Sequence, residues 1–185
     1  MHRYCPKLLL SVIPQLQEEM SIDNVQIRLL ATQTLGDMFA HKQHGSELMR
    51  DYRTTWVQWI ARKNDKTPAV RLAFVEGAKK LIGNMDMRVD IDGEYTIISN
   101  SSRSRTMECI PEAMKAKICD PDDKVRAAVC KAYGDLDFET AAYHASESML
   151  RLIGDRLLDK KVKVSHSPRL ARCLTLPAHC QNRSL

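Results

Sequence analysis

The sequence repeats one apolar pattern three times, and this repetition constrains the fold more than any single motif. Segments 23–39, 64–82 and 120–137 each contain an apolar residue followed by arginine, with further apolar or small residues at offsets of 3, 4, 7, 8 and 11. Those positions are Ile27, Leu30, Ala31, Thr34, Leu35 and Met38 in the first copy, Val70, Ala73, Phe74, Gly77, Ala78 and Leu81 in the second, and Val125, Ala128, Val129, Ala132, Tyr133 and Leu136 in the third. Such offsets place side chains on one face of an α-helix. The repeat therefore predicts three amphipathic helices.

Each predicted helix follows a second segment with helical periodicity. The apolar residues of these earlier segments are Leu9, Val12, Ile13, Leu16 and Met20, then Tyr52, Trp56, Trp59 and Ile60, then Ile110, Met114 and Ile118. Short polar linkers join the partners, as antiparallel helix pairs require. Met149, Ile153 and Leu157 begin a fourth pair. Asp23 and Asp120 stand just before second helices, where we expect them to cap the helix or stabilise its dipole.

The spacing of the copies matches that of HEAT-type helical repeats. Arg28 and Arg71 are 43 residues apart, within the ~40–47 residues of such a repeat. Arg71 and Arg126 are 55 residues apart, so additional sequence lies between them. We therefore predict an all-α fold, a HEAT-type solenoid of antiparallel helix pairs in which neighbouring pairs form each other's core. The predicted pairs cover about 6–43, 48–84 and 108–137, and a partial pair covers 146–164.

Two segments depart from the repeat. Residues 90–106 are Ser-rich and aperiodic, and we predict an insert loop there. Residues 165–185 are predicted to form an irregular tail, because Pro168 and Arg172 stand at offsets where the pattern requires apolar residues. The codons near the start of each departure can contain GTGAGT, a common start of an intron. We hypothesise that both segments are translated intron sequence.

The composition is that of a folded protein rather than a disordered or membrane-spanning one. Hydrophobic residues make up 44% and charged residues 28%, and the net charge is +5. No apolar run approaches the ~20 residues of a membrane span, and the first residues lack the features of a signal peptide. The six cysteines form no C-x-x-C pair, so we expect reduced thiols. We therefore expect a cytosolic or nuclear protein without a membrane partner.

Few residues suggest catalysis or metal binding. His41 and His44 could lie one turn apart and share a metal ion. Cys119, Asp120 and His144 could form a nucleophile constellation, but the acidic run beside Cys119 disfavours a thiolate. We therefore expect no enzyme activity and no metal, and we interpret the two histidines as part of a polar helix end.

Charged residues recur at fixed places in the three copies. The six positions are Asp23, Arg28, Asp65, Arg71, Asp120 and Arg126. In each copy the aspartate precedes the arginine by five or six residues. We interpret these residues as a structural ladder of charge pairs between neighbouring repeats, with a ligand site as the alternative.

A group of basic residues is the strongest candidate for partner binding. Arg62, Lys63 and Lys66 fall in a predicted turn between helices, where solenoids often present binding residues. Lys79 and Lys80 follow on the next helix. Such a patch could hold an acidic peptide or a polyphosphate. A solvated turn explains the same residues equally well.

The repeat copies also resemble one particular family. The segments VQIRLLATQTLGDMFA, WIARKNDKTPAVRLAFVEGAKKLI and ICDPDDKVRAAVCKAYGDLDFETA resemble the precocious-dissociation-of-sisters proteins. The resemblance runs from about residue 8 to residue 164, outside the insert, and ARKNDK with DPDDKVRAAVCK is its most specific part. It implies a central piece of a longer, non-enzymatic HEAT scaffold that regulates sister-chromatid cohesion in the nucleus.

The same resemblance implies a set of partners. They are the kleisin subunit of cohesin, the cohesin-releasing factor and the cohesin acetyltransferase, with chromatin association through cohesin. It also allows an inositol polyphosphate as a ligand, without assigning residues to it. Two alternatives remain open. One is another HEAT scaffold, such as a nuclear-transport receptor or a phosphatase scaffold, and the other is a direct nucleic-acid-binding helical-repeat protein whose affinity would fall steeply with salt.

Overall fold

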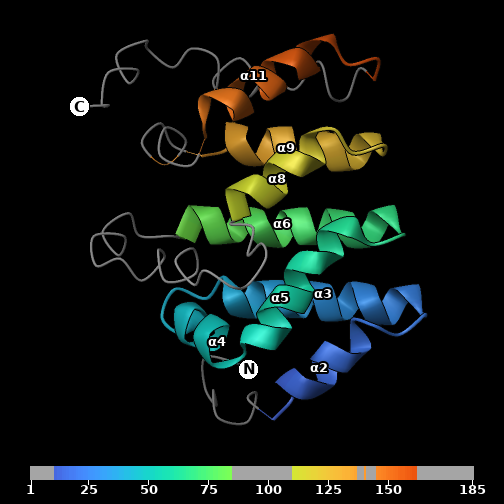
Figure 1. The fold of residues 1–185 in the computed structure, drawn as a ribbon, viewed down its shortest axis with the longest axis vertical. Coiled ribbons are helices and arrows are strands. Elements are labelled where there is room, and N and C mark those ends of the chain that lie inside the picture. Colours follow the sequence, from blue (N-terminus) through green and yellow to red (C-terminus); the bar gives the residue numbers. More distant parts are fainter. Residues whose placement is uncertain (1–10, 85–109, 137–139, 141–144, 162–185) are drawn as a thin grey trace, which may run out of the picture. The chain divides into compact units, whose positions relative to one another are not determined.

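The computed structural model describes residues 11–84, 110–136, 140 and 145–161. Its helices are α2 (Ile13–Glu19), α3 (Val25–Phe39), α4 (Gly45–Asp51), α5 (Arg53–Ala61), α6 (Pro68–Asn84), α8 (Ile110–Ile118), α9 (Asp123–Gly134) and α11 (Glu147–Asp155), with 3-10 turns η1 (Arg62–Asn64) and η3 (Arg156–Leu158) (Figure 1). The predicted all-α helical-repeat fold class is confirmed. The predicted insert 90–106 and tail 165–185 lie outside the described residues.

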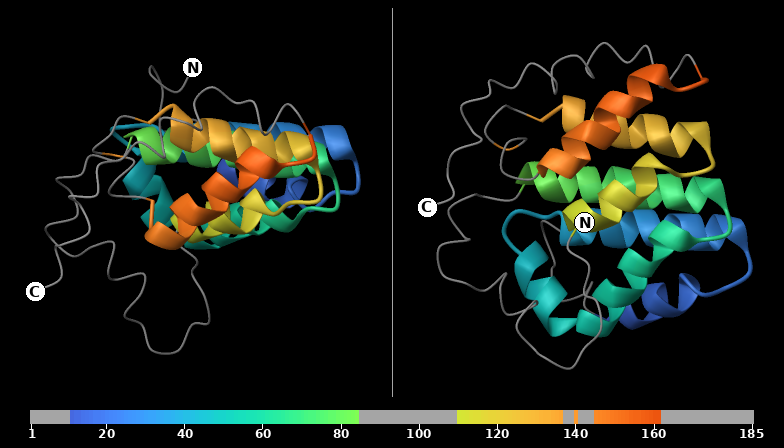
Figure 2. Two further views of the ribbon diagram at one scale, coloured as in Figure 1. Left: turned by 90° about the horizontal axis from the view of Figure 1, so that it is seen from above. Right: turned by 45° about the horizontal axis from the view of Figure 1, so that its top comes forward.

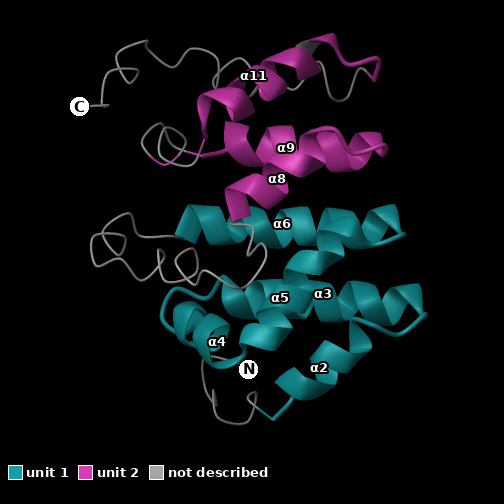
Figure 3. Ribbon diagram, viewed as in Figure 1, with its two compact units in different colours: residues 1–107 teal, residues 108–185 magenta. Residues whose placement is uncertain are grey.

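The chain divides into two compact units, residues 1–107 and residues 108–185 (Figure 3). The first unit, here called unit 1, contains α2 to α6, and the second, unit 2, contains α8 to α11. Each unit holds helices from two of the four predicted pairs. None of the helices in the described ranges is both long and apolar enough to cross a membrane.

The core of unit 1 forms where α5 packs against α3 and α6, which lie side by side (Figure 2). Trp59 is fully buried, and its ring lies 5.8 Å from that of Phe39 and 4.9 Å from that of Phe74, measured between centroids. The Trp59 indole Nε1 donates a hydrogen bond of 2.9 Å to the carbonyl oxygen of Thr32. This bond satisfies the polar atom of a large buried ring, as a core tryptophan requires.

Two glycines let α3 and α6 approach closely beneath that ring. A Cβ atom on Gly77 would lie 2.8 Å from Cζ2 of Trp59 and 3.3 Å from Cα of Gly36. A Cβ atom on Gly36 would lie 3.3 Å from Cα of Gly77 and 3.3 Å from Cζ2 of Trp59. Real Cβ contacts are rarely so short, so the absence of a side chain at both positions sets the separation of the two helices.

The predicted apolar pattern is fully packed in α6 but only partly packed in α3. In α6, Val70 is fully buried and Ala73 is 5% exposed. The residues at the same offsets in α3 are Ile27, which is 36% exposed, and Leu30, which is 63% exposed. The prediction that Ile27 and Leu30 pack in the core is therefore wrong for the described residues. The physical reason is that α3 covers this side of α6, whereas no described helix covers the corresponding side of α3.

Unit 2 has its own apolar core. Its fully or almost fully buried side chains include Ile110, Met114 and Ile118 of α8, Val125, Val129 and Tyr133 of α9, and Met149 and Ile153 of α11. The spacing of three or four residues within each helix turns these side chains to one face. The periodicity therefore identified the buried faces of these helices.

Polar side chains begin three of the helices. Asn24 accepts hydrogen bonds from the backbone N–H groups of Gln26 and Ile27 at the start of α3. Asp122 accepts from the N–H groups of Lys124 and Val125 at the start of α9, and Ser146 accepts from that of Met149 at the start of α11. Asp23 and Asp120 do not cap these helices, because the capping residues lie one or two positions later in the chain.

Candidate functional site

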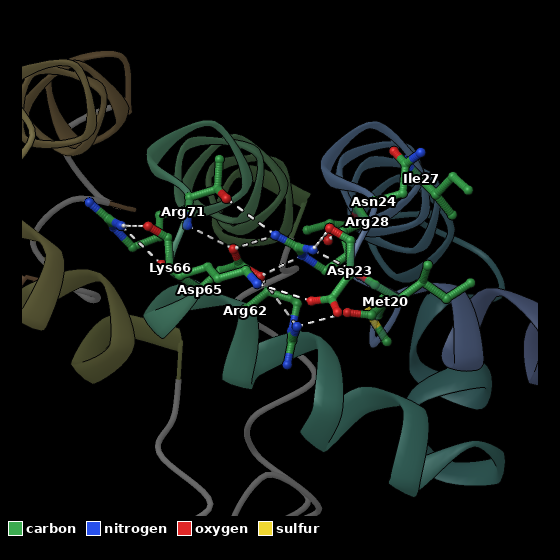
Figure 4. A network of polar contacts seen from close by, with 12 residues as sticks. Met20, Asp23, Asn24, Ile27, Arg28, Arg62, Asp65, Lys66 and Arg71 are labelled. Carbon is green, nitrogen blue, oxygen red and sulfur yellow. Dashed lines mark hydrogen bonds and ion pairs between the residues drawn. The ribbon is translucent and has the colours of Figure 1, made fainter.

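The most buried charges of unit 1 join its two helix pairs (Figure 4). Nε of Arg28 on α3 lies 3.1 Å from Oδ2 of Asp65, which follows η1, and each side chain is 3% exposed. Nη2 of the same arginine donates to Oγ1 of Thr67 at 3.2 Å. The arginine of one pair thus reaches the turn of the next pair.

Unit 2 contains the same arrangement. Nε and Nη2 of Arg126 on α9 donate to the two carboxylate oxygens of Asp159, at 2.8 and 3.0 Å. The hydrogen bond from Arg126 lowers the pKa of Asp159 to about 2, although burial opposes this shift. The same bond raises the pKa of Arg126. We call the pairs Arg28–Asp65 and Arg126–Asp159 the charge ladder.

Each repeat arginine also closes its own turn. Nη1 of Arg28 donates to the carbonyl oxygens of Ile22 and Asp23, both at 2.7 Å. Nη1 of Arg71 donates to those of Asp65 and Lys66, at 2.9 and 3.4 Å. Nη1 of Arg126 donates to those of Asp120 and Pro121, at 2.9 and 3.1 Å. A guanidinium group has five N–H donors in a rigid fork, so it can hold both turns together. These contacts give the arginines a structural role.

Sequence reasoning missed the unit 2 acceptor, Asp159. It used the arginines to align the copies, and the fourth copy has no such arginine. A second signal was present in the sequence, because a basic residue stands three positions before each turn aspartate. These pairs are Arg62–Asp65 at 3.3 Å, Lys117–Asp120 at 3.2 Å and Arg156–Asp159 at 3.5 Å.

The structure does not bring the predicted basic residues into one patch. Arg62 donates to the carbonyl of Met20 at 2.7 Å as well as to Asp65, and Lys63 is only 7% exposed. Lys66 is exposed but lies 3.0 Å from Oδ1 of Asp23, and the hydrogen bond from Lys66 lowers the pKa of that carboxyl group.

The remaining two basic residues, Lys79 and Lys80, lie far along α6 from that turn. They follow Pro68, the first residue of α6, by 11 and 12 positions, or roughly 17 Å at ~1.5 Å per residue. Lys80 is paired with Asp37. A polyphosphate needs several converging cations, so these residues do not fit an inositol polyphosphate.

His41 and His44, the candidate metal ligands, form no metal site in the described ranges. The rings of His41 and His44 stack with centroids 5.4 Å apart, and Nδ1 of His44 lies 3.5 Å from Oε2 of Glu47. Within the described ranges, no group of three or more His, Cys, Asp or Glu side chains could hold a metal ion. Cys119 is exposed, and His144 lies outside the described residues.

A surface groove of about 360 Å³ runs between α3 and α6. Its lining residues are Leu29, Gln33 and Asp37 of α3 and Ala69, Leu72, Ala73, Glu76, Gly77 and Lys80 of α6. Asp37 and Lys80 form an ion pair across the groove. Gln33 and Glu76 are exposed and have no intramolecular polar partner among the described residues. The groove thus offers apolar surface beside a free carboxylate.

Comparison with known proteins identifies a family. A family model described as "Sister chromatid cohesion protein PDS5 protein" matches residues 1–167. "Sister chromatid cohesion protein pds5" of Schizosaccharomyces pombe is 31% identical over 162 residues, covering 88% of this chain and 12% of that protein. "Sister chromatid cohesion protein PDS5 homolog A" of Homo sapiens is 25% identical over 180 residues, covering 95% of this chain and 12% of that protein.

One solved structure has the same fold. It carries the description "Structure of the Pds5-Scc1 complex and implications for cohesin function", and it superposes with a TM-score of 0.70 at 16% identity. The match covers 91% of this chain and 23% of the solved chain. This chain therefore corresponds to a small part of the length of its relatives.

Proposed function

This chain belongs to the PDS5 family of sister chromatid cohesion proteins, and from that membership we propose that it forms a segment of a helical-repeat scaffold. The scaffold regulates sister-chromatid cohesion by binding cohesin subunits and their regulators. It acts by controlled association rather than by catalysis. The observation that carries this proposal is the match of the family model to residues 1–167.

We propose the kleisin subunit of cohesin as the first partner. The solved relative with the same fold was described in a complex with Scc1, which supports this choice. The cohesin-releasing factor and the cohesin acetyltransferase are proposed as further partners, on chromatin in the nucleus. No ligand is proposed, because the basic residues of unit 1 do not converge.

The groove between α3 and α6 is the surface that we propose for the kleisin contact. The ladder arginines and Arg62 already hold the turns of the scaffold, so their charges are used within the fold. The groove instead presents Leu29 and Leu72 beside Glu76, whose carboxylate has no polar partner among the residues that the structure describes. An apolar peptide carrying a Lys or Arg residue would complement this surface.

The test is a binding titration with the full chain. A fluorescently labelled kleisin segment from the same organism is titrated with the 185-residue chain, and binding is followed by anisotropy. We expect saturable binding that Glu76→Arg weakens at least tenfold, because the substitution opposes the basic residue of the peptide. Glu18→Arg on α2 is the matched control, since Glu18 is also exposed and lies outside the groove.

Each outcome decides between function classes. Absence of kleisin binding, combined with DNA binding that weakens steeply with salt, would replace the scaffold function with nucleic-acid binding. Equal weakening by Glu76→Arg and Glu18→Arg would show that the contact lies outside the groove and depends on overall charge.

A further inference from the structure

Thr67 stands at the turn where the two helix pairs of unit 1 meet, directly before Pro68, the first residue of α6. Its backbone N–H donates to Oδ1 of Asp65 at 2.8 Å, and its Oγ1 accepts a hydrogen bond of 3.2 Å from Nη2 of Arg28. The Arg28 side chain is 3% exposed, whereas Thr67 is half-buried and its neighbours Lys66 and Pro68 are exposed. A buried guanidinium group thus contacts the hydroxyl oxygen of a residue that solvent reaches.

The equivalent position in unit 2 carries a permanent negative charge. Thr67 stands two residues after the turn aspartate Asp65, and Asp122 stands two residues after Asp120. The backbone N–H of Asp122 donates to Oδ1 of Asp120 at 3.0 Å, as the N–H of Thr67 does to Asp65. The Asp122 carboxylate in turn accepts from two backbone N–H groups of α9, at 2.9 and 3.2 Å. The repeat therefore accommodates an anion at this position, beside its turn aspartate.

The turn of Thr67 also has more positive than negative charge. Residues 19–28 and 62–71, which contain the two adjoining turns, include five basic and three acidic side chains. A phosphate monoester carries a charge of about −1.5 to −2 at pH 7, which matches this surplus of positive charge. Lys66 is available to such a group, because it and its partner Asp23 are 70% and 98% exposed and pair only weakly. A phosphate fixed by a covalent bond does not need the several converging cations that a dissociable polyphosphate requires.

The sequence around Thr67 is that of a kinase substrate. Thr67–Pro68 is one of two Ser/Thr–Pro pairs in the chain, and the other, Ser167–Pro168, lies outside the described residues. A threonine followed by proline is the minimal motif of proline-directed serine/threonine kinases. Proline also disfavours a helical backbone at the residue before it, which favours the extended conformation in which kinases bind their substrates.

We propose that Thr67 is a phosphorylation site for a proline-directed kinase, and that its phosphate is held by Arg28 and Lys66 at the start of α6. The γ-phosphoryl group of ATP passes to Oγ1 of Thr67. A P–O bond forms at Oγ1, the bond to the β-phosphate oxygen breaks, ADP leaves, and the hydroxyl proton passes to the catalytic aspartate of the kinase. The phosphate adds charge-assisted hydrogen bonds and meets the positive end of the α6 dipole, so it strengthens the joint between the two helix pairs. This inference does not rest on the kleisin contact proposed for the groove.

The first test is phosphorylation of the full 185-residue chain. The chain is incubated with Mg²⁺, ATP and a purified mitogen-activated protein kinase, and the modified residues are located by mass spectrometry after proteolysis. We expect phosphate on Thr67, and we expect Thr67→Val to abolish it without changing the modification of Ser167. Absence of phosphate from Thr67 in the folded chain would overturn the proposal, whether or not Ser167 is modified.

The second test measures the effect of the phosphate on the fold. It uses the Ser167→Ala chain, in which Thr67–Pro68 is the only Ser/Thr–Pro pair. Phosphorylation should raise the Tm of this chain by about 3 °C or more. Lys66→Met should remove about half of that rise, although it should change the Tm of the unmodified chain by less than about 2 °C. A Tm that falls on phosphorylation would show that the Asp65 carboxylate repels the phosphate, and would overturn its placement beside Arg28.

An aspartate at the same position gives a readout that needs no kinase. Thr67→Asp reproduces in unit 1 the residue that Asp122 supplies in unit 2, and it should raise the Tm by about 2 °C. Thr54→Asp is the matched control, because Thr54 is exposed in the first turn of α5, at the opposite end of that helix from the turn of Thr67. It should change the Tm by less than about 1 °C. Equal rises for the two variants would show a helix-dipole effect alone, and would overturn the role of Arg28 and Lys66.

Discussion

Arg28 and Asp65, which are 37 residues apart in the chain, form an ion pair of 3.1 Å in which both side chains are 3% exposed. Asp65→Asn should therefore destabilise unit 1 by about 3 kcal/mol, because the substitution leaves the Arg28 guanidinium buried without its counter-charge. The measurement is urea unfolding followed by tryptophan fluorescence, since both tryptophans of the chain lie in α5 of unit 1.

An exposed pair between the same two turns provides the control for that measurement. Lys66 and Asp23 are paired at 3.0 Å, but their side chains are 70% and 98% exposed. Lys66→Met should change the free energy of unfolding by less than about 0.5 kcal/mol, since exposed pairs contribute little. Losses of similar size for Asp65→Asn and Lys66→Met would contradict a special role for the buried pair.

The Asp159 carboxylate should make the stability of unit 2 sensitive to acid. Its pKa is lowered from 3.8 to about 2 in the folded chain, chiefly by the hydrogen bond from Arg126. The unfolded state therefore binds a proton first as the pH falls. The resulting stabilisation, about 1–2 kcal/mol after allowance for solvent screening, is present above about pH 4 and is lost as the pH falls toward about 2.

Asp159→Asn isolates this contribution. The variant should be less stable than the parent chain at pH 6, and the difference should shrink between about pH 4 and pH 2. Circular dichroism of urea unfolding at a series of pH values measures it. A difference that stays constant across this range would show that the carboxylate charge is not the cause.

The apolar spacing of the sequence predicted the helices of the repeat because it records which side chains share a face, but it did not predict α4 (Gly45–Asp51) as a separate helix. It was not sufficient to predict what covers each face. Ala73 and Leu30 occupy the same offset, yet one is 5% and the other 63% exposed, because only Ala73 has a neighbouring helix in the described structure. Burial at such positions depends on the neighbouring pair and not on the local pattern.

The candidate binding residues show a second limit of sequence reasoning. Arg62, Lys66 and Lys80 lie within residues 62–80 and share a positive charge. Arg62 pairs with Asp65 of its own turn, whereas Lys66 pairs with Asp23 before α3 and Lys80 pairs with Asp37 of α3. Their proximity in the sequence did not indicate that each of these cations is paired with an aspartate of the same chain. The recurrence of aspartate and arginine was more informative, because equal spacing in successive repeats places equivalent groups at the same edge of the fold.

The N-cap of α9 should carry a measurable share of the stability of unit 2. Asp122 accepts hydrogen bonds from the backbone N–H groups of Lys124 at 2.9 Å and Val125 at 3.2 Å. Asp122→Ala should cost about 1 kcal/mol, because two N–H groups at the helix start lose their acceptor. Lys124→Ala, at an exposed position of the same turn, should stay within about 0.5 kcal/mol. Urea unfolding measured by circular dichroism compares the two variants, and equal effects would argue against capping.

The glycines of α6 should respond in opposite directions to the same substitution. Alanine is favoured over glycine in a helix by about 1 kcal/mol, and at Gly83 a new Cβ atom would meet nothing within 4 Å. Gly83→Ala should therefore stabilise unit 1 by up to about 1 kcal/mol. At Gly77 the Cβ atom would lie 2.8 Å from Cζ2 of Trp59, a ring held by the Thr32 carbonyl.

Because that ring cannot move without disturbing the core, Gly77→Ala should destabilise unit 1 by about 1–3 kcal/mol despite the gain in helix propensity. It should also shift the tryptophan emission of the folded chain, since Trp59 has to move. Fluorescence-detected urea unfolding of the two variants gives both readouts. Stabilisation by Gly77→Ala would show that α3 and α6 can separate to accept a methyl group, and that the contact between Gly36 and Gly77 does not set their distance.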